Sequence, residues 1–202
     1  MTGNAVETPY GRAVVHLYAA DDARGALVLG HGAAGGVSAR DLVSVTEAAR
    51  AIGVSVALVE QPYRVAGRRA PAPARQLDGA WIAVVDHLRA GDLRGLPLVV
   101  GGRSSGSRVA CRTAAATGPV AVLCLAFPLR PPRRSGTPSP DRLHELDAVK
   151  VPTLVVQGAR DPFGIPPAAP RRTIVQVAGD HSLRTDLAAV AAAVRAWLPM
   201  VV

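Results

Sequence analysis

The residues with the clearest chemical potential are those of the segment Gly102-Arg103-Ser104-Ser105-Gly106, in which a serine stands between two glycines. The apolar run of residues 98–101 leads into this segment, and a pattern typical of a helix follows it over residues 105–116. A tight strand-to-helix turn holds its central residue in a strained conformation, and glycines on either side leave room for that turn. The pattern therefore predicts Ser104 as a nucleophile that stands clear of a sheet, with the N-terminus of a helix behind it.

Two further segments carry groups that would activate this serine. Asp161 follows the apolar run of residues 153–157, and His181 follows the run of residues 173–177. The carboxyl ends of parallel strands meet at one edge of a sheet, so we expect these side chains to gather there. His181 would be the general base that takes the Ser104 proton. Asp161 would accept the other ring N–H and stabilise the imidazolium as it forms.

Attack by a serine on an acyl carbon also requires two preorganised N–H donors for the developing oxyanion. The backbone N–H of Ser105, at the start of the helix, is the first predicted donor. Residues 26–29 form an apolar run that leads into a glycine-rich loop over residues 30–36, and the backbone N–H of Ala33 is the second. His31 lies in the same loop, where we expect it to brace the turn through hydrogen bonds rather than to act as the base.

The roles of Asp161 and Arg103 have alternatives. Asp180 adjoins His181 and competes with Asp161 for the acid role, but sequence neighbours in a tight turn rarely point at each other, so we favour Asp161. Asp161 would alternatively cap a short helix that begins near Pro162. Arg103 would be able to bind an anionic group of a substrate, although we expect a solvated or salt-bridged arginine.

Short apolar runs alternate with helical patterns along almost the whole chain, and this alternation predicts the elements that position the site. The predicted strands cover residues 14–17, 26–29, 54–59, 98–101, 120–126, 153–157 and 173–177. Apolar residues recur at helical spacing over residues 42–52, 77–88 and 187–197. Continuous apolar strands are typical of a parallel sheet covered on both faces. The sequence therefore predicts one α/β domain over residues 1–202, with a doubly wound, mostly parallel sheet of about seven strands.

Two stretches interrupt the alternation, namely residues 64–75 and residues 129–140. Both are rich in proline or glycine and are predicted to be loops, because proline lacks an N–H and disfavours helix at the residue before it. The connection that contains the second stretch leaves room for one short helix over residues 141–149. This predicts little or no lid and an open site.

The composition is that of a globular chain, since 49% of the 202 residues are hydrophobic and 19% are charged. No apolar run approaches the roughly 18 residues of a membrane span. Residues 1–12 do not have the charged start and apolar stretch of a secretory signal, so we expect a cytoplasmic protein. Cys111 and Cys124 are expected to be small buried packing residues rather than a disulfide.

The formal net charge of +8 raises the question of a nucleic-acid partner. The chain has three pairs of adjacent arginines, Arg68-Arg69, Arg133-Arg134 and Arg171-Arg172, and Lys150 is the only lysine. Aromatic residues make up only 3% of the chain, which leaves no stacking platform for bases. We therefore expect a solvated basic surface, with no nucleic acid and no membrane as partner.

With these residues placed, the chain resembles the KANL/Tex family of small α/β-hydrolases and, more distantly, the dienelactone hydrolases, over about residues 26–197. The most specific segments are Gly30-His31-Gly32-Ala33, residues 60–68, residues 101–111, Phe127-Pro128-Leu129 with Pro131-Pro132, residues 156–164, and Gly179-Asp180-His181-Ser182. The resemblance implies the α/β-hydrolase fold, a serine nucleophile and no metal or organic cofactor. It places the triad on Ser104, Asp161 and His181, with Ser105 where the family often has Met or a small apolar residue.

Three hypotheses about function follow. The first is a serine hydrolase that acts on a small carboxylic ester or thioester through an acyl-enzyme, and the triad with its oxyanion loop favours it. The second is an interaction module that retains the strand-to-helix turn around Ser104, called the nucleophile elbow, but does not catalyse a reaction. The resemblance implies such a role for some eukaryotic relatives, and an unreactive Ser104 would favour it. The third is nucleic-acid binding through the basic loops, which would show strong salt dependence. The physiological substrate and the oligomeric state are left open.

Overall fold

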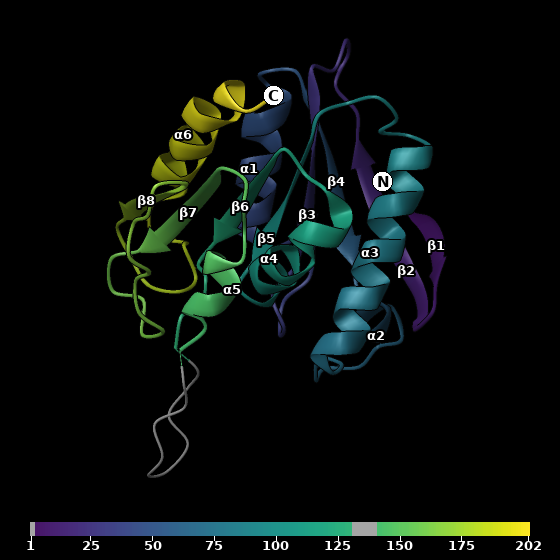
Figure 1. Cartoon of the computed structure of the whole chain (residues 1–202), viewed down its shortest axis with the longest axis horizontal. Helices are drawn as coiled ribbons and strands as arrows, with labels where there is room; N and C mark the ends of the chain where they lie inside the picture. The colour runs from purple at the N-terminus through teal and green to yellow at the C-terminus, as the bar shows by residue number, and fades with distance from the viewer. Residues whose placement is uncertain (1–2, 131–140) are drawn as a thin grey trace.

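The computed structural model describes residues 3–130 and 141–202, which form an eight-stranded sheet with helices on both faces (Figure 1). The strand order is β1-β2-β4-β3-β5-β6-β7-β8. The strands are β1 (Asn4–Thr8), β2 (Gly11–Tyr18), β3 (Gly25–Gly30), β4 (Val54–Glu60), β5 (Leu98–Arg103), β6 (Ala121–Leu125), β7 (Thr153–Gly158) and β8 (Arg172–Val177). Strands β3 to β8 pair in parallel, whereas β1 and β2 add an antiparallel edge. The mostly parallel, doubly wound α/β sheet is thus confirmed.

The helices are α1 (Arg40–Arg50), α2 (Pro62–Val65), α3 (Ala74–Ala90), α4 (Ser105–Thr117), α5 (Leu143–Asp147), α6 (Leu187–Trp197) and the 3₁₀ turn η1 (Leu198–Met200). Side chains alternate between the two faces of each strand, which divides the core in two. In β3, Ala26 and Val28 join the core with α3 and α4, while Leu27 and Leu29 join the core with α1 and α6. Burial on both faces is why the central strands are apolar without interruption.

All seven predicted strands are present, with ends that shift by at most a few residues, and the sheet has one strand more than expected. The additional strand is β1, in which only Val6 is buried. An edge strand with a single buried side chain carries almost no hydrophobic pattern, so sequence reasoning missed it.

The prediction of a loop over residues 64–75 is wrong at both ends. Helix α2 includes Arg64 and Val65, and helix α3 begins at Ala74. The first turn of α2 starts at Pro62, where the missing N–H of proline costs no hydrogen bond. The predicted helix over residues 141–149 is confirmed as the shorter α5, and residues 131–140 of the second predicted loop lie outside the described residues.

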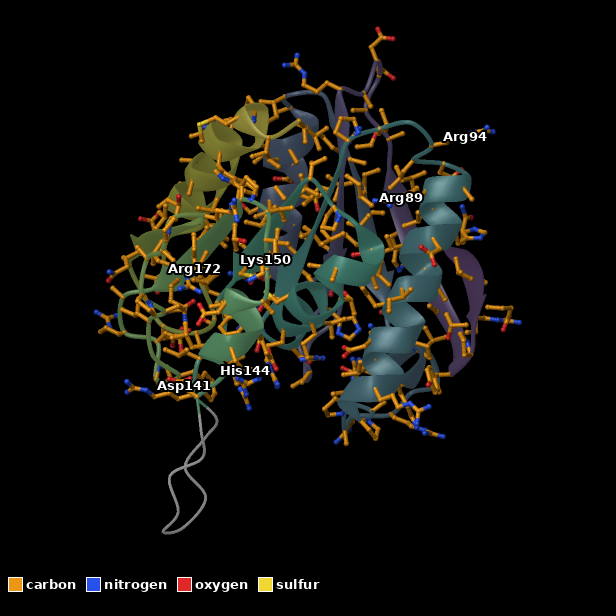
Figure 2. The ribbon with its side chains drawn as sticks, viewed as in Figure 1. Arg89, Arg94, Asp141, His144, Lys150 and Arg172 are labelled. Atoms are coloured by element: carbon orange, nitrogen blue, oxygen red, sulfur yellow. The ribbon has the colours of Figure 1, made fainter. Side chains whose placement is uncertain are left out.

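The basic clusters are less uniformly solvated than predicted. Arg172, in the pair Arg171-Arg172, is only 7% exposed and lies within the fold (Figure 2). Its guanidinium forms an ion pair with Asp147 at 3.0 Å and donates to the carbonyl of Pro167 at 2.8 Å. Arg133 and Arg134 lie outside the described residues. In the part of the chain that the structure describes, no helix is both long and apolar enough to cross a bilayer.

The two cysteines are free and buried, as predicted. Cys111 on α4 and Cys124 on β6 face each other with their Sγ atoms 3.5 Å apart. The hydrogen bond between the thiols and the burial of both raise the pKa of Cys124 well above its usual value. A thiol in this environment stays protonated and packs as a small apolar side chain.

Candidate active site

Ser104 occupies a sharp turn between β5 and α4. Its backbone has φ 52° and ψ −110°, a region that non-glycine residues rarely adopt. Gly102 and Gly106 pack directly against the end of β3, because a Cβ on either would lie 2.5 Å or 2.3 Å from the carbonyl oxygen of Gly30. Both glycines are therefore required for the turn, and the strain at Ser104 is held by the close packing of three backbone segments.

The three predicted side chains meet at the carboxyl edge of the sheet. His181 Nε2 lies 2.9 Å from Ser104 Oγ, and His181 Nδ1 lies 2.8 Å from Asp161 Oδ2. The carboxylate only accepts hydrogen bonds, so the proton of the neutral imidazole resides on Nδ1, and Nε2 accepts from the serine hydroxyl. This arrangement allows proton transfer from Ser104 to His181 while Asp161 compensates the charge that develops on the ring.

Asp161 is held by more than the histidine. Its side chain is fully buried, and Oδ1 accepts the Phe163 N–H at 2.8 Å. Oδ2 accepts the Gln157 amide at 2.8 Å in addition to the histidine N–H. Sequence analysis considered Asp161 as the cap of a short helix. The Asp161 carboxylate does accept the Phe163 N–H as a helix cap would, but no helix follows, and the same carboxylate also accepts from His181.

Gln157 is a site residue that sequence reasoning missed. It is fully buried at the end of β7, and its Nε2 also lies 3.1 Å from the Phe127 carbonyl and 3.0 Å from that of Gly164. A lone amide in an otherwise apolar strand was the available signal. Gln157 ties the acid residue to the loops that follow β6 and β7.

Asp180 does not compete for the acid role. Its Oδ1 accepts both the N–H and the hydroxyl of Ser182, at 2.9 Å and 2.6 Å. These hydrogen bonds lower the pKa of Asp180 below its usual value. The carboxylate closes a local turn, which leaves the imidazole of His181 to Asp161.

An aromatic ring screens the imidazole. Phe163 meets His181 edge-on, with ring centroids 4.5 Å apart and planes at 69°. The His181 side chain is 18% exposed, so one part of the ring stays accessible while Phe163 covers another. The contact fixes the ring plane that the two hydrogen bonds require.

The glycine-rich loop after β3 passes beside the elbow. A Cβ on Gly32 would lie 3.5 Å from the Cβ of Ser104. The Gly35 N–H donates to the Gly32 carbonyl at 3.1 Å and closes the turn that contains Ala33. Tyr63 Oη donates to the Ala33 carbonyl at 2.9 Å, which anchors the turn to α2. The loop therefore lies where an oxyanion donor is needed, and the roles of Ala33 and Ser105 stay predictions.

His31 braces this loop, as expected. Its Nδ1–H donates to the Gly32 carbonyl at 2.8 Å, and its Nε2 accepts the Gln61 N–H at 3.1 Å. Burial lowers the pKa of His31 below its usual value, since a charged ring would be poorly solvated there. A neutral ring with both nitrogens engaged in backbone contacts is not available as the general base.

Arg103 is salt-bridged, the role that we expected for it. Its Nε lies 2.9 Å from Oδ2 of Asp41, a buried residue of α1 that the sequence did not single out. Burial raises the pKa of Asp41, while Arg103 opposes that rise. A second guanidinium nitrogen donates to the His181 carbonyl at 3.2 Å. Arg103 thus positions the histidine loop and has its charge neutralised by Asp41.

Comparison with known proteins identifies the family and the fold. A family model described as an alpha/beta hydrolase domain matches residues 23–189. The solved structure of XC6422 from Xanthomonas campestris, described as an a/b serine hydrolase without lid, has a TM-score of 0.75 at 19% identity and covers 98% of this chain and 95% of that one. No curated protein is significantly similar in sequence.

Two other solved structures have the same fold. Est1E from Butyrivibrio proteoclasticus has a TM-score of 0.81 at 16% identity, over 99% of this chain and 98% of that one. A dienelactone hydrolase from Anabaena variabilis has a TM-score of 0.78 at 19% identity, over 100% and 97%. The fold is thus shared over nearly the whole length of these three proteins.

Proposed function

The chain belongs to the alpha/beta hydrolase domain family, and on this premise we propose that it is a serine hydrolase that cleaves small carboxylic esters through an acyl-enzyme. The observation that carries the proposal is the continuous hydrogen-bond chain from Asp161 through His181 to Ser104, which ends on a strained elbow. Strain in the backbone and a buried carboxylate both reduce stability, and a protein that only needed the scaffold would gain nothing from either.

In the proposed reaction, His181 Nε2 takes the Ser104 proton while Oγ attacks the ester carbonyl carbon. The carbonyl oxygen becomes an oxyanion that the backbone N–H groups of Ala33 and Ser105 stabilise. When the tetrahedral intermediate collapses, the imidazolium gives its proton to the departing alcohol and the acyl group stays on Oγ. A water molecule, deprotonated by His181, then attacks the acyl-enzyme and releases the acid, which restores the serine hydroxyl.

The remaining contacts describe how the site is positioned. Gln157 and the Phe163 N–H orient the acid residue, Arg103 holds the histidine loop, and Tyr63 fixes the loop of Ala33. These groups reduce the reorganisation that the reaction requires, which is the main source of electrostatic catalysis in such sites. Closer membership in the KANL/Tex family stays a prediction.

Labelling by a fluorophosphonate probe tests the proposal, because the probe reacts only with a serine that a base activates. We expect the native protein to be labelled and both Ser104→Ala and His181→Ala to be unlabelled. Ser44→Ala is a matched control, since the Ser44 hydroxyl on α1 only donates to the Leu187 carbonyl. Absence of labelling in a well-folded native protein would overturn the proposal and leave the interaction module as the better hypothesis.

A further inference from the structure

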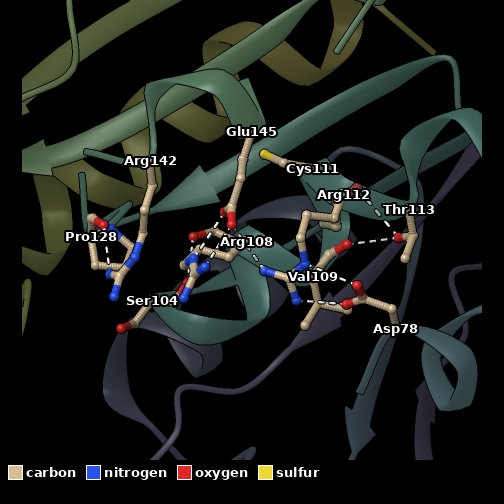
Figure 3. A network of polar contacts seen from close by, with 12 residues as sticks. Asp78, Ser104, Arg108, Val109, Cys111, Arg112, Thr113, Pro128, Arg142 and Glu145 are labelled. Atoms are coloured by element: carbon tan, nitrogen blue, oxygen red, sulfur yellow. Dashed lines mark hydrogen bonds and ion pairs between the residues drawn. The ribbon is translucent and has the colours of Figure 1, made fainter. Parts of the chain in front are cut away.

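Helix α4 continues from the elbow into a charged network that the triad does not use (Figure 3). Arg108 forms two hydrogen bonds with Glu145 of α5, at 2.6 Å and 2.9 Å. Arg112 forms a similar pair with Asp78 of α3, at 2.6 Å and 2.9 Å, and lies 3.4 Å from Glu145. Burial opposes ionisation of Glu145, but the two arginines lower its pKa overall. The two carboxylates are thus fully engaged by Arg108 and Arg112.

Arg142 is a third cation at this network, and among the described residues no carboxylate lies within ion-pair distance of it. It is partly buried and precedes Glu145 by three residues, and one of its guanidinium N–H groups donates to the Pro128 carbonyl at 2.9 Å. It forms no ion pair with any described residue. Burial and the neighbouring Arg108 lower the pKa of Arg142 below its usual value, although the charge of Glu145 opposes that shift. Among the described residues, Glu145 and Asp78 thus form their ion pairs with Arg108 and Arg112, and Arg142 forms none.

The unpaired charge lies at the serine end of the network. The Ser104 N–H donates to the Leu125 carbonyl at 2.9 Å, so the elbow abuts the end of β6, and Pro128 follows three residues later. Figure 3 agrees, since Arg142 and Pro128 lie at the same end of the network as Ser104. The Arg142 side chain thus reaches the segment that leaves β6 beside the nucleophile.

The same segment links Arg142 to the histidine side of the site. The backbone N–H of Arg142 donates to the Leu129 carbonyl at 2.8 Å, and the backbone N–H of Arg130 donates to the Phe163 carbonyl at 2.8 Å. Phe163 is the residue whose ring covers His181. Residues 127–130 therefore connect Arg142 with the ring that screens the imidazole, and the Arg142 guanidinium lies on the Pro128 carbonyl of this segment.

We propose that Arg142 is a specificity-determining residue that binds a free carboxylate on the substrate, so that the preferred esters carry a negative charge. This inference rests on the proposed hydrolase function and names its substrate class. A guanidinium presents a planar set of five donors, and in the part of the chain that the structure describes only one of them is engaged, by the Pro128 carbonyl. The remaining donors match the two oxygens of a carboxylate, which would be an ion-pair partner for Arg142. Arg103, for which sequence analysis considered anion binding only as an alternative, already forms an ion pair with Asp41.

Matched ester pairs that differ only in charge test the inference. On the alcohol side, 4-acetoxybenzoate is compared with its methyl ester, and on the acyl side the mono-4-nitrophenyl ester of adipic acid is compared with 4-nitrophenyl hexanoate. The native protein should favour the anionic member of at least one pair in kcat/KM. In Arg142→Gln this preference should fall by about 10- to 100-fold, mainly through KM, with the neutral ester little affected.

Two further variants separate charge from structure. Arg142→Lys keeps the charge without the fork and should retain part of the preference. Arg94→Gln removes one exposed arginine on the other side of the molecule from Asp141 and His144 of the α5 region, and should leave the preference unchanged (Figure 2). If Arg142→Gln does not fold, inhibition of the native protein tests the carboxylate subsite instead. We expect 4-hydroxybenzoate to compete with the neutral ester substrate, and methyl 4-hydroxybenzoate not to compete.

The outcomes distinguish this inference from the function on which it rests. Hydrolysis of neutral esters with no preference for the anionic ones, or equal losses on both in Arg142→Gln, would overturn the carboxylate subsite and leave the hydrolase intact. Failure to hydrolyse any ester, together with an unlabelled Ser104, would overturn the hydrolase itself.

Discussion

Gln157 donates its side-chain amide to Asp161 Oδ2 at 2.8 Å, and this oxygen is also the one that faces His181 Nδ1. The acid residue, in the loop after β7, is therefore positioned by a residue near the end of that strand as well as by the histidine. Such a support fixes the orientation of a catalytic carboxylate without touching the substrate.

Replacing this support should slow the reaction without weakening substrate binding. In Gln157→Leu we expect kcat to fall by roughly 10-fold, as for the loss of an outer contact that orients a reactive group, with KM unchanged. Gln176→Leu is the control, because Gln176 is the exposed register partner of Gln157 on β8. Steady-state kinetics on a neutral ester check this, and a change confined to KM would contradict a positioning role.

The hydroxyl of Tyr63 should matter for the oxyanion loop. In Tyr63→Phe the Ala33 carbonyl loses its 2.9 Å hydrogen bond, so the loop that is to present the second donor becomes less fixed. We expect kcat to fall by several-fold to about 10-fold, since a preorganised donor contributes most in the transition state. Tyr10→Phe, a change in a partly exposed ring, should have no effect. Equal activity of the native protein and Tyr63→Phe would argue against Ala33 as a donor.

The glycines of the elbow should tolerate no side chain. In Gly106→Ala the new Cβ would lie 2.3 Å from the Gly30 carbonyl oxygen, so the elbow and β3 would have to separate. We expect the free energy of unfolding to fall by about 1–3 kcal/mol, the usual cost of overpacking, and activity to be lost. Gly36→Ala is the matched control, because the nearest atom to its Cβ is 3.9 Å away. Urea denaturation measures both, and equal stability losses would contradict the close approach.

The neutral state of His31 should make stability depend on pH. Burial lowers its pKa in the folded protein, so the unfolded chain binds the extra proton first as the pH falls through about 6.5. The stabilising contribution of the neutral ring is therefore present above that pH and is lost below it, by at most about 1.4 kcal/mol per pH unit for one proton. Thermal unfolding between pH 8 and pH 5 should show a steeper decline for the native protein than for His31→Gln. Parallel curves would mean that His31 is not the group responsible.

Local patterns of the sequence were enough to predict most of the fold. The apolar runs around residues 26–29 and 153–157 are strands because both faces are buried, and the helical spacing over residues 187–197 identifies α6. Ser104, Asp161 and His181 each follow such a run, and a parallel sheet collects the ends of its strands at one edge. Their proximity thus follows from local features and a general rule of topology.

The contacts between side chains were decided only by the tertiary structure. The sequence favoured Asp161 over Asp180 only through a general rule about neighbours in a tight turn, whereas the contact itself is a hydrogen bond between residues 20 positions apart. The Arg103–Asp41 ion pair and the unpaired state of Arg142 have no local pattern either, because their partners come from distant segments. Periodicity records which face of an element is buried, since burial acts on every turn or pleat. It does not record which polar group a side chain meets, because that depends on how the elements pack.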